Sequence, residues 1–347
     1  MNNNFPKGFL IFTCLIIIFS AMKFAQQLVV PFLLAIFISF ICAPPLNYLN
    51  SKRIPPVMSV SIIIIFLISF SLLITYIIGN SINNLGKSLP HYKVKFENQI
   101  QSLNEFFSSN GIELNVSLLN QYVDPSTIMQ FFANSISAFG NVLTNYFIIL
   151  LIVAFTLLEI SLLSQKVTAI LNSKKKIKDF EFIGDKINKY LAIKTIVSAI
   201  TGLVIFISLS ILKIDYAILW GIIAFFFNFI PNIGSILAAI PAVLLSFLQF
   251  DISIMLLVVL IYGIVNIVMG NIIEPRYLGK ELGLSTLVVF ISLIFWGWLL
   301  GPVGMILSIP LTIIAKIILE NNESTRWVAI LLLSLIHISE PTRQAMI

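Results

Sequence analysis

One group of polar residues that could bind a solute interrupts an apolar stretch running from Tyr216 to Leu248. The interruption reads Asn228-Phe-Ile-Pro231-Asn232-Ile-Gly234, and Pro241 follows it. Proline removes a backbone hydrogen-bond donor, and a broken helical turn leaves carbonyl groups unpaired. Unpaired backbone is costly in hydrocarbon, so such a segment must be buried in protein or line a wet cavity. Broken helices of this kind form binding sites in secondary transporters, and a simple loop between two short spans is the alternative interpretation.

A second group of residues carries charge next to apolar sequence. It consists of Glu274, Pro275 and Arg276, followed by Gly279. A charge at the bilayer centre costs about 2.5–3.5 kcal/mol on insertion scales, so we expect Glu274 and Arg276 to be interfacial, paired, or both. Pro275 should end the helix between them. A capped cytoplasmic turn without a special role is the competing interpretation.

Other chemistry has no candidate groups. The segment from Ser81 to Ser88 nearly matches a phosphate-binding loop, but it lacks the first glycine and follows a membrane helix instead of a strand. HExxH, CxxC and GxSxG motifs and paired intramembrane aspartates are absent from the sequence. The two histidines, His91 and His337, lie far apart, and Cys14 and Cys42 lie in apolar stretches. We therefore expect no catalytic residue, no metal, no cofactor and no enzyme activity.

The composition predicts the class of fold that positions these residues. Of 347 residues, 59% are hydrophobic and 10% are charged, against roughly 45–50% and 25% in soluble domains. The mean hydropathy is +1.02, so the apolar surface exceeds what a soluble core could bury. The fold class predicted is an all-α integral membrane protein.

Apolar stretches long enough to cross a bilayer predict about eight membrane segments, because a helix needs about 20 residues for one crossing. Clean candidates are Val57–Gly79, Asn141–Leu158, Thr195–Leu212 and Ile252–Gly270. The stretch from Gly8 to Pro44 is too long for one span, and Lys23, Gln26, Gln27 and Pro31 should divide it. A signal peptide over residues 1–22 is the alternative there. Two longer stretches, Tyr216–Leu248 and Leu282–Leu319, each predict two helical pieces that span or re-enter. The second is broken by Gly297, Gly301-Pro302 and Gly304, and Pro310 lies further on.

Lysine distribution predicts the orientation. The segment 165–194 carries eight lysines and should be cytoplasmic, as an amphipathic helix on the membrane or a solvated connector. Lys52, Arg53 and Lys7 agree with cytoplasmic N- and C-termini. Residues 80–140 have no positive excess, so they should form a small extracytoplasmic helical domain. Ile100, Leu103 and Phe107 share a helical face there, and Asp124-Pro125 should start the following helix.

These patterns predict four regions. Residues 1–79 form the N-terminal membrane segments, 80–140 the outer domain and 141–332 the C-terminal membrane core. Residues 333–347 match the translation of a transposase mosaic end and adapter from a common sequencing library. We therefore expect the natural sequence to be cut off near Leu332 and His337 to have no function.

Three ordered segments resemble the AI-2E family of bacterial transporters. They are Phe229–Val243, Glu274–Lys280 and Phe295–Met305 with Pro310, and Pro31–Ala35 with Pro44 fits the N-terminal pattern of the family. The resemblance covers about residues 8–332. Asn232 departs from it, since an aromatic residue is common there, and the outer domain matches only in length and position.

The resemblance implies a multi-span protein with a small extra-membrane domain. Some members export the quorum-sensing signal autoinducer-2 (AI-2), and others exchange sodium or lithium for protons. Functional candidates carried over by position are Pro231, Gly234, Glu274, Pro275, Arg276, Gly279, Gly301 and Gly304.

Together, these observations predict a bacterial inner-membrane permease that exports a small solute and forms a homo-oligomer. Its partners would be lipid and a small molecule or ion, with no nucleic acid. We expect the transport path to contain Asn228, Pro231, Asn232, Gly234, Gly301 and Gly304, and the cytoplasmic gate or coupling group to contain Glu274, Pro275, Arg276 and Gly279. Cation–proton antiport is the alternative, although Glu159 and Glu274 lie near span ends and no carboxylate lies deep. A non-transporting scaffold that binds a partner through residues 85–135 is a third hypothesis.

Overall fold

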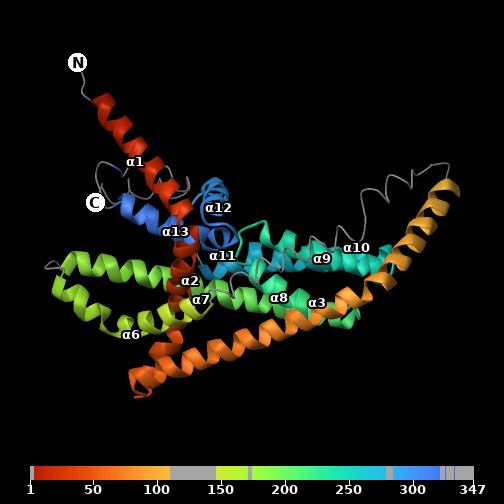
Figure 1. Ribbon diagram of the computed structural model, residues 1–347, viewed down its shortest axis with the longest axis horizontal. Helices are drawn as coiled ribbons and strands as arrows, with labels where there is room; N and C mark the ends of the chain where they lie inside the picture. Colours follow the sequence, from red (N-terminus) through yellow and green to blue (C-terminus); the bar gives the residue numbers. More distant parts are fainter. Residues whose placement is uncertain are drawn as a thin grey trace. The chain divides into compact units, whose positions relative to one another are not determined.

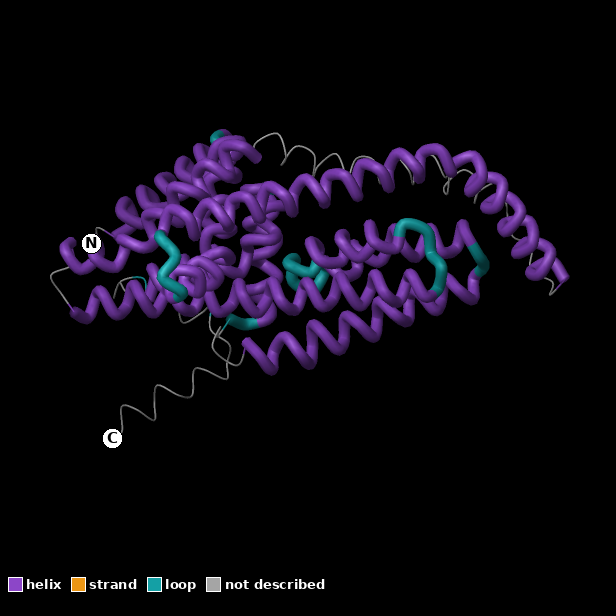
Figure 2. The backbone as a smooth tube through the Cα atoms, turned by 90° about the horizontal axis from the view of Figure 1, so that it is seen from below, coloured by secondary structure: helices purple, strands orange, loops and turns teal. Residues whose placement is uncertain are grey.

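The computed structural model describes residues 4–109, 146–170, 174–278 and 284–320, with Thr325 and Leu332. Every regular element in this part of the chain is a helix (Figures 1 and 2), which confirms the predicted fold class. The elements are α1 Asn4–Phe24, α2 Gln26–Ser51, α3 Pro56–Ser109, α6 Tyr146–Ile170, α7 Lys174–Ile211, α8 Ala217–Phe227, α9 Gly234–Gln249, α10 Ile252–Asn266, the π-helix η1 Ile267–Ile273, α11 Glu274–Leu278, α12 Thr286–Leu300 and α13 Pro302–Glu320.

Five helices in the described ranges are long and apolar enough to cross a membrane. They cover Gln26–Ser51, Pro56–Ser88, Lys186–Ile211, Ile252–Tyr277 and Pro302–Glu320. Shorter apolar helices cover Phe12–Phe24, Tyr146–Glu159, Ala217–Phe227, Gly234–Gln249 and Thr286–Leu300. Large apolar side chains are exposed along most of these helices, as lipid contact requires and as water would penalise.

The N-terminal apolar stretch divides where the sequence predicts. Helix α1 ends at Phe24 and α2 begins at Gln26, so the interruption lies between Lys23 and Gln26. Pro31 does not take part in the division, because it lies buried inside α2. Helix α2 packs on α6, which brings two segments distant in sequence together.

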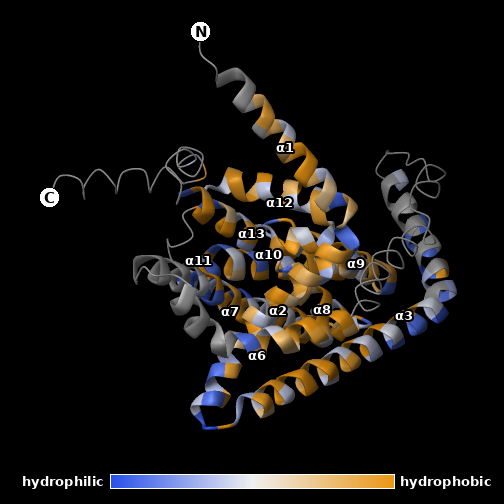
Figure 3. Cartoon of the chain, turned by 60° about the vertical axis from the view of Figure 1, so that its left-hand side comes forward, coloured by the Kyte–Doolittle hydropathy of each residue, from blue (hydrophilic) through white to orange (hydrophobic). Residues whose placement is uncertain are grey.

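Helix α3 has 54 residues and passes from apolar to polar sequence without a break (Figure 3). The expected span, Val57–Gly79, forms its first part, and residues 80–109 continue the same helix. The rest of the predicted outer domain, including Asp124-Pro125, lies outside the described residues. So do the side chains of Ile100, Leu103 and Phe107 and the tail 333–347.

The chain forms two compact units. One contains residues 1–64, 145–193 and 277–347, and the other contains residues 65–144 and 194–276. Helices α3 and α7 each contribute to both. The four regions expected from polarity remain a prediction.

Helix α7 joins the predicted cytoplasmic link to the following span as one element. Ile187, Tyr190 and Leu191, which belong to the predicted apolar face of the link, are buried in the first unit. The segment from Lys186 onward is therefore part of a packed helix.

Both long, broken stretches form helical hairpins. In the second unit α8 and α9 pack together, with residues 228–233 as the connection. In the first unit α12 and α13 pack together around Gly301. Pro241 and Pro310 do not break the chain, because each lies inside a helix.

The expected helix end at Pro275 is wrong. Helix α10, the π-helix η1 and α11 follow one another from Ile252 to Leu278. A proline ring conflicts with the carbonyl group four residues before it in an α-helix. The wider π turn ahead of Pro275 gives a physical reason why the chain continues past it.

Candidate functional site

The interruption between α8 and α9 is a tight, ordered turn. Asn232 adopts a left-handed backbone with φ of 59°. The amides of Phe229 and Ile230 donate to the carbonyls of Phe226 and Phe227, which closes the end of α8. The turn therefore reverses the chain at Pro231 and Asn232 within six residues.

Gly234 allows this reversal. A Cβ atom at this position would lie 1.8 Å from the carbonyl oxygen of Phe227, so the first residue of α9 touches the last turn of α8. Only glycine fits such a backbone approach. The role expected for Gly234 as part of a helix break therefore has a steric basis.

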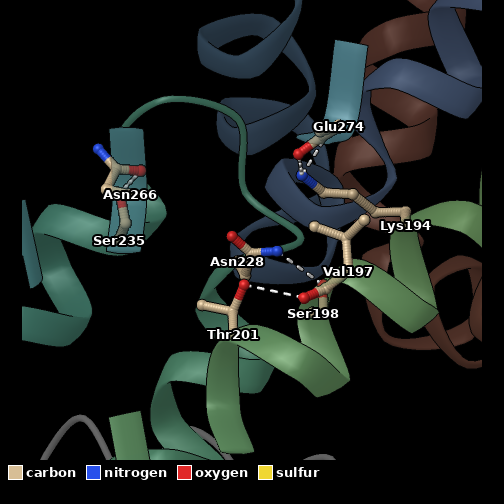
Figure 4. Close-up of polar contacts among 8 residues, drawn as sticks. All are labelled: Lys194, Val197, Ser198, Thr201, Asn228, Ser235, Asn266 and Glu274. Carbon is tan, nitrogen blue, oxygen red and sulfur yellow. Dashed lines mark hydrogen bonds and ion pairs between the residues drawn. The ribbon is translucent and has the colours of Figure 1, made fainter. Parts of the chain in front are cut away.

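Both sides of the interruption are held by neutral hydrogen bonds to neighbouring helices (Figure 4). On the α8 side, Asn228 Nδ2 donates to Ser198 Oγ of α7 at 2.9 Å, and both residues are buried. On the α9 side, Ser235 Oγ donates to Asn266 Oδ1 of α10 at 2.7 Å. Thr201, one turn beyond Ser198 on α7, adds a buried hydroxyl that donates to the Val197 carbonyl. Amides and hydroxyls thus surround the break.

A buried ion pair lies on the same helix α7. Lys194 Nζ is 2.7 and 2.8 Å from the two carboxylate oxygens of Glu274. The side chains are 5% and 15% exposed, so both charges are largely removed from solvent. Lys194, Ser198 and Thr201 follow one another at spacings of four and three residues, which places them on one face of α7. The ion pair and the neutral contacts at Asn228 therefore share this face.

The π-helix η1 decides which charged residue turns inward. A buried stripe runs from α10 into η1 and contains Val258, Tyr262, Val265 and Met269, at spacings of four, three and four residues. A regular α-helix would continue this stripe near residues 272–273 and 276. In η1 the amide of Glu274 instead bonds to the carbonyl of Met269, five residues earlier. The π turn therefore contains one residue more than an α-helical turn, and this additional residue turns the Glu274 side chain toward Lys194.

Arg276 is exposed. Sequence reasoning grouped Glu274 with Arg276, whereas the structure pairs Glu274 with Lys194. The predicted grouping differs from the observed pair because the π turn shifts the helical register of Glu274. No residue pattern in the sequence had indicated that turn.

One buried hydroxyl near the break has no partner. Among the described residues, Tyr262 Oη makes no hydrogen bond, although the side chain is buried. Tyr262 precedes Asn266 by four residues and so lies one turn away on the same side of α10. A buried hydroxyl left unpaired costs about 1–3 kcal/mol, and such groups often have a functional reason.

The α12–α13 hairpin repeats the steric arrangement. Gly301 has φ of 70°, and a Cβ at Gly304 would lie 1.9 Å from the carbonyl oxygen of Trp296. A Cβ at Gly297 would meet the side chain of Met305, so this glycine is also a close-packing point between the two helices. Trp296 Nε1 donates to Thr312 Oγ1 at 3.0 Å across the hairpin. Gly301 and Gly304 thus have a demonstrated structural role.

The predicted residues are distributed over both units. Asn228, Pro231, Asn232, Gly234 and the triplet Glu274–Arg276 belong to the second unit, and Gly301 and Gly304 to the first. A path formed jointly by the two breaks remains a prediction. Gly279 lies outside the described residues. In the described ranges, no group of three or more His, Cys, Asp or Glu side chains could hold a metal ion.

Sequence reasoning missed six residues of this site. They are Lys194, Ser198, Thr201, Ser235, Asn266 and Tyr262. The spacing of the first three on one helical face was available in the sequence. Lys194, however, was counted among the lysines of the cytoplasmic link, where it indicated orientation only.

Comparison with known proteins gives a consistent result. The sequence profile described as "AI-2E family transporter" matches residues 12–324. "AI-2 transport protein TqsA" of Escherichia coli is 40% identical over 319 residues, which cover 92% of this chain and 93% of that protein. A Haemophilus influenzae protein, named only provisionally as a transport protein, is 36% identical and covers 95% of this chain and 97% of its own length. YhhT of Escherichia coli, also named provisionally for transport, is 28% identical over 92% of this chain and 91% of its own.

Proposed function

Because this chain belongs to the AI-2E family of transporters, we propose that it is a permease that exports a small, uncharged polar solute, with the AI-2 signal as the first candidate. The name of TqsA assigns AI-2 transport to that relative, and its similarity extends over nearly the whole of both chains. The protein is a multi-pass bacterial membrane protein. Its location in the inner membrane, with cytoplasmic N- and C-termini, is part of the proposal and is supported by the lysine-rich segment 165–194.

The polar side chains around the α8–α9 break are uncharged, and this is the observation that supports an uncharged solute. The side chains that hold the break are Asn228, Ser198, Ser235 and Asn266, which donate and accept hydrogen bonds without carrying charge. Tyr262 adds a buried hydroxyl with a free hydrogen-bonding capacity among the described residues. A hydroxylated solute would satisfy such groups in place of water.

The Lys194–Glu274 pair favours a gate over a proton relay. A cation–proton antiporter needs a carboxylate that exchanges its proton inside the membrane. Glu274 is instead held by both oxygens to a buried ammonium group, so the pair carries no net charge. We therefore assign Glu274 and Lys194 to a cytoplasmic gate, with Arg276 exposed beside it, and keep antiport as the second candidate.

The proposal also includes the course of the transport path and the oligomeric state. The breaks at Pro231–Gly234 and Gly301–Gly304 would together form the path, since both present irregular backbone within apolar sequence. The chain would act as a homo-oligomer.

The test is efflux of AI-2 from proteoliposomes containing the purified full-length protein. We expect Asn228→Ala to lower the efflux rate at least tenfold, because it removes one of the neutral groups at the break. Tyr262→Phe should raise the apparent KM about tenfold while leaving the protein folded. Asn84→Ala on the exposed side of α3 is the matched control and should behave as wild type.

Antiport is measured in the same vesicles with a pH-sensitive dye and an imposed sodium gradient. Sodium-driven proton flux without AI-2 efflux would overturn the proposed solute in favour of the second candidate. Absence of both fluxes from folded wild-type protein would support the scaffold hypothesis.

A further inference from the structure

We propose that Tyr92 and Asp215 form an outer latch, which closes the extracytoplasmic end of the second unit and opens in alternation with the Lys194–Glu274 pair. The inference rests on the proposed function, because alternate opening has a purpose only in a transporter. Its residues belong to none of the groups discussed above.

The latch itself is a short hydrogen bond between the buried Tyr92 and the exposed Asp215. Tyr92 Oη donates to Asp215 Oδ2 at 2.5 Å, and Tyr92 is 3% exposed. Burial raises the pKa of the Tyr92 hydroxyl well above its ordinary value, and the hydrogen bond to Asp215 raises it further. Tyr92 therefore remains a protonated donor facing a carboxylate acceptor. Hydrogen bonds to a charged group are stronger than neutral ones.

Asp215 is part of a polar platform that joins both ends of the α8–α9 hairpin. Its amide donates to Gln249 Oε1 at 2.9 Å, and Gln249 Nε2 donates to the Lys213 carbonyl at 2.9 Å. Trp220 Nε1 donates to the Asp215 carbonyl at 3.0 Å. These hydrogen bonds connect the start of α8 to the end of α9. A displacement of Asp215 would therefore move both helices of the hairpin.

Helix α3 binds this platform along one face. Lys95 Nζ donates to the Gln249 carbonyl at 3.0 Å, and Gln99 Nε2 donates to the Phe250 carbonyl. Ser88 Oγ lies 3.4 Å from the hydroxyl of Tyr216. The α3 residues involved are 88, 92, 95 and 99, at spacings of four, three and four residues, which define one helical stripe. The polar continuation of α3 thus lies along the loops before α8 and after α9.

Helix α7 runs from Lys194 of the inner pair toward the outer latch, because Asp215 follows the last residue of α7 by four residues. Lys194 and Ile211, the last residue of α7, are 17 residues apart, which corresponds to about 26 Å along an α-helix. That distance approaches the hydrocarbon thickness of a bilayer, about 30 Å. Helix α7 contacts the α8 side of the break through Ser198, so this helix connects the inner pair to the interruption and leads into the loop that carries Asp215. Such a connection allows opening at one end to accompany closing at the other.

The experiment measures access to the break from each side of the membrane. Ile233→Cys, a half-buried residue in the break, is the reporter in a chain with Cys14→Ala and Cys42→Ala. A membrane-impermeant maleimide is applied to right-side-out and inside-out vesicles. We expect Tyr92→Phe to increase the labelling rate from outside about tenfold and to decrease it from inside. Lys194→Met should do the reverse.

Tyr76→Phe is the matched control, because Tyr76 lies on the same helix and is 71% exposed; it should leave both rates unchanged. Lys95→Ala, which removes a half-exposed donor to the platform, should shift both rates as Tyr92→Phe does, and it serves if that variant fails to fold. Equal increases from both sides, or no change, would overturn the latch. Opposite shifts in a protein without AI-2 efflux would support the latch while refuting the proposed solute.

Discussion

At the residue scale, the buried Lys194–Glu274 pair provides a direct test of the site. Removing one partner of a buried ion pair leaves an uncompensated charge and costs about 3–5 kcal/mol. We expect Lys194→Met to lower the thermal unfolding temperature in detergent, and the double variant with Glu274→Leu to recover most of the loss. The Lys316–Glu320 pair of α13, separated by 3.7 Å, is the control: Glu320 is 42% exposed, so Glu320→Gln should cost less than about 1 kcal/mol. Additive losses in the double variant at 194 and 274 would contradict the pairing.

The glycine at the start of α9 gives a second prediction at this scale. Gly234→Ala would place a Cβ 1.8 Å from the Phe227 carbonyl, so the break must open and folded yield should fall severely. Gly263→Ala in α10 is the control, because nothing lies within 4 Å of a Cβ there. The alanine should be neutral or slightly stabilising, since alanine favours helix by about 1 kcal/mol over glycine. Monodisperse protein recovered after size-exclusion chromatography is the readout. Equal recovery of the two variants would show that the close approach is not required.

At the scale of elements, the π-helix η1 sets the direction of Glu274. Deleting Gly270 shortens the separation of Met269 and Glu274 from five residues to four, so a regular α-helix would still turn Glu274 toward Lys194. Inserting one alanine after Asn271 would rotate Glu274 by about 100° away. We expect the deletion to retain the ion pair and the insertion to lose it.

A thermodynamic cycle in thermal stability shows whether each variant retains the Lys194–Glu274 ion pair. In the insertion variant, Glu274→Gln should cause no further loss of thermal stability, because the pair is already absent. In the deletion variant, Glu274→Gln should remain as destabilising as in the parent. The reverse pattern would show that the π turn does not orient this carboxylate.

At the scale of the whole molecule, the proposed orientation predicts which side of the membrane Val94 and Tyr277 face. Val94 lies beside the outer latch on α3 and is 57% exposed, and Tyr277 follows the inner pair and is 65% exposed. In the background without native cysteines, Val94→Cys should react with an impermeant maleimide in intact cells. Tyr277→Cys should react only in inverted vesicles. Reversed labelling would place the lysine-rich segment outside and refute the cytoplasmic gate.

Composition and periodicity alone determined the fold class, most of the helices and both interruptions. The reason is that hydrocarbon tolerates little besides apolar side chains and closed backbone hydrogen bonds, so spans and breaks are evident residue by residue. The family was also recognisable, because the glycines and prolines of the breaks are fixed by local steric requirements at Gly234 and Gly304.

The tertiary structure decided which polar groups meet. Lys194 and Glu274 are 80 residues apart in sequence, and Tyr92 and Asp215 are 123 apart. Such pairs depend on helix register and on which faces pack, and a single π turn changed the register that a regular helix would have given. Pairwise contacts across distant segments carry no periodic signal in one sequence, and for this reason the partners of Glu274 and Tyr92 became visible only when the helices were placed together.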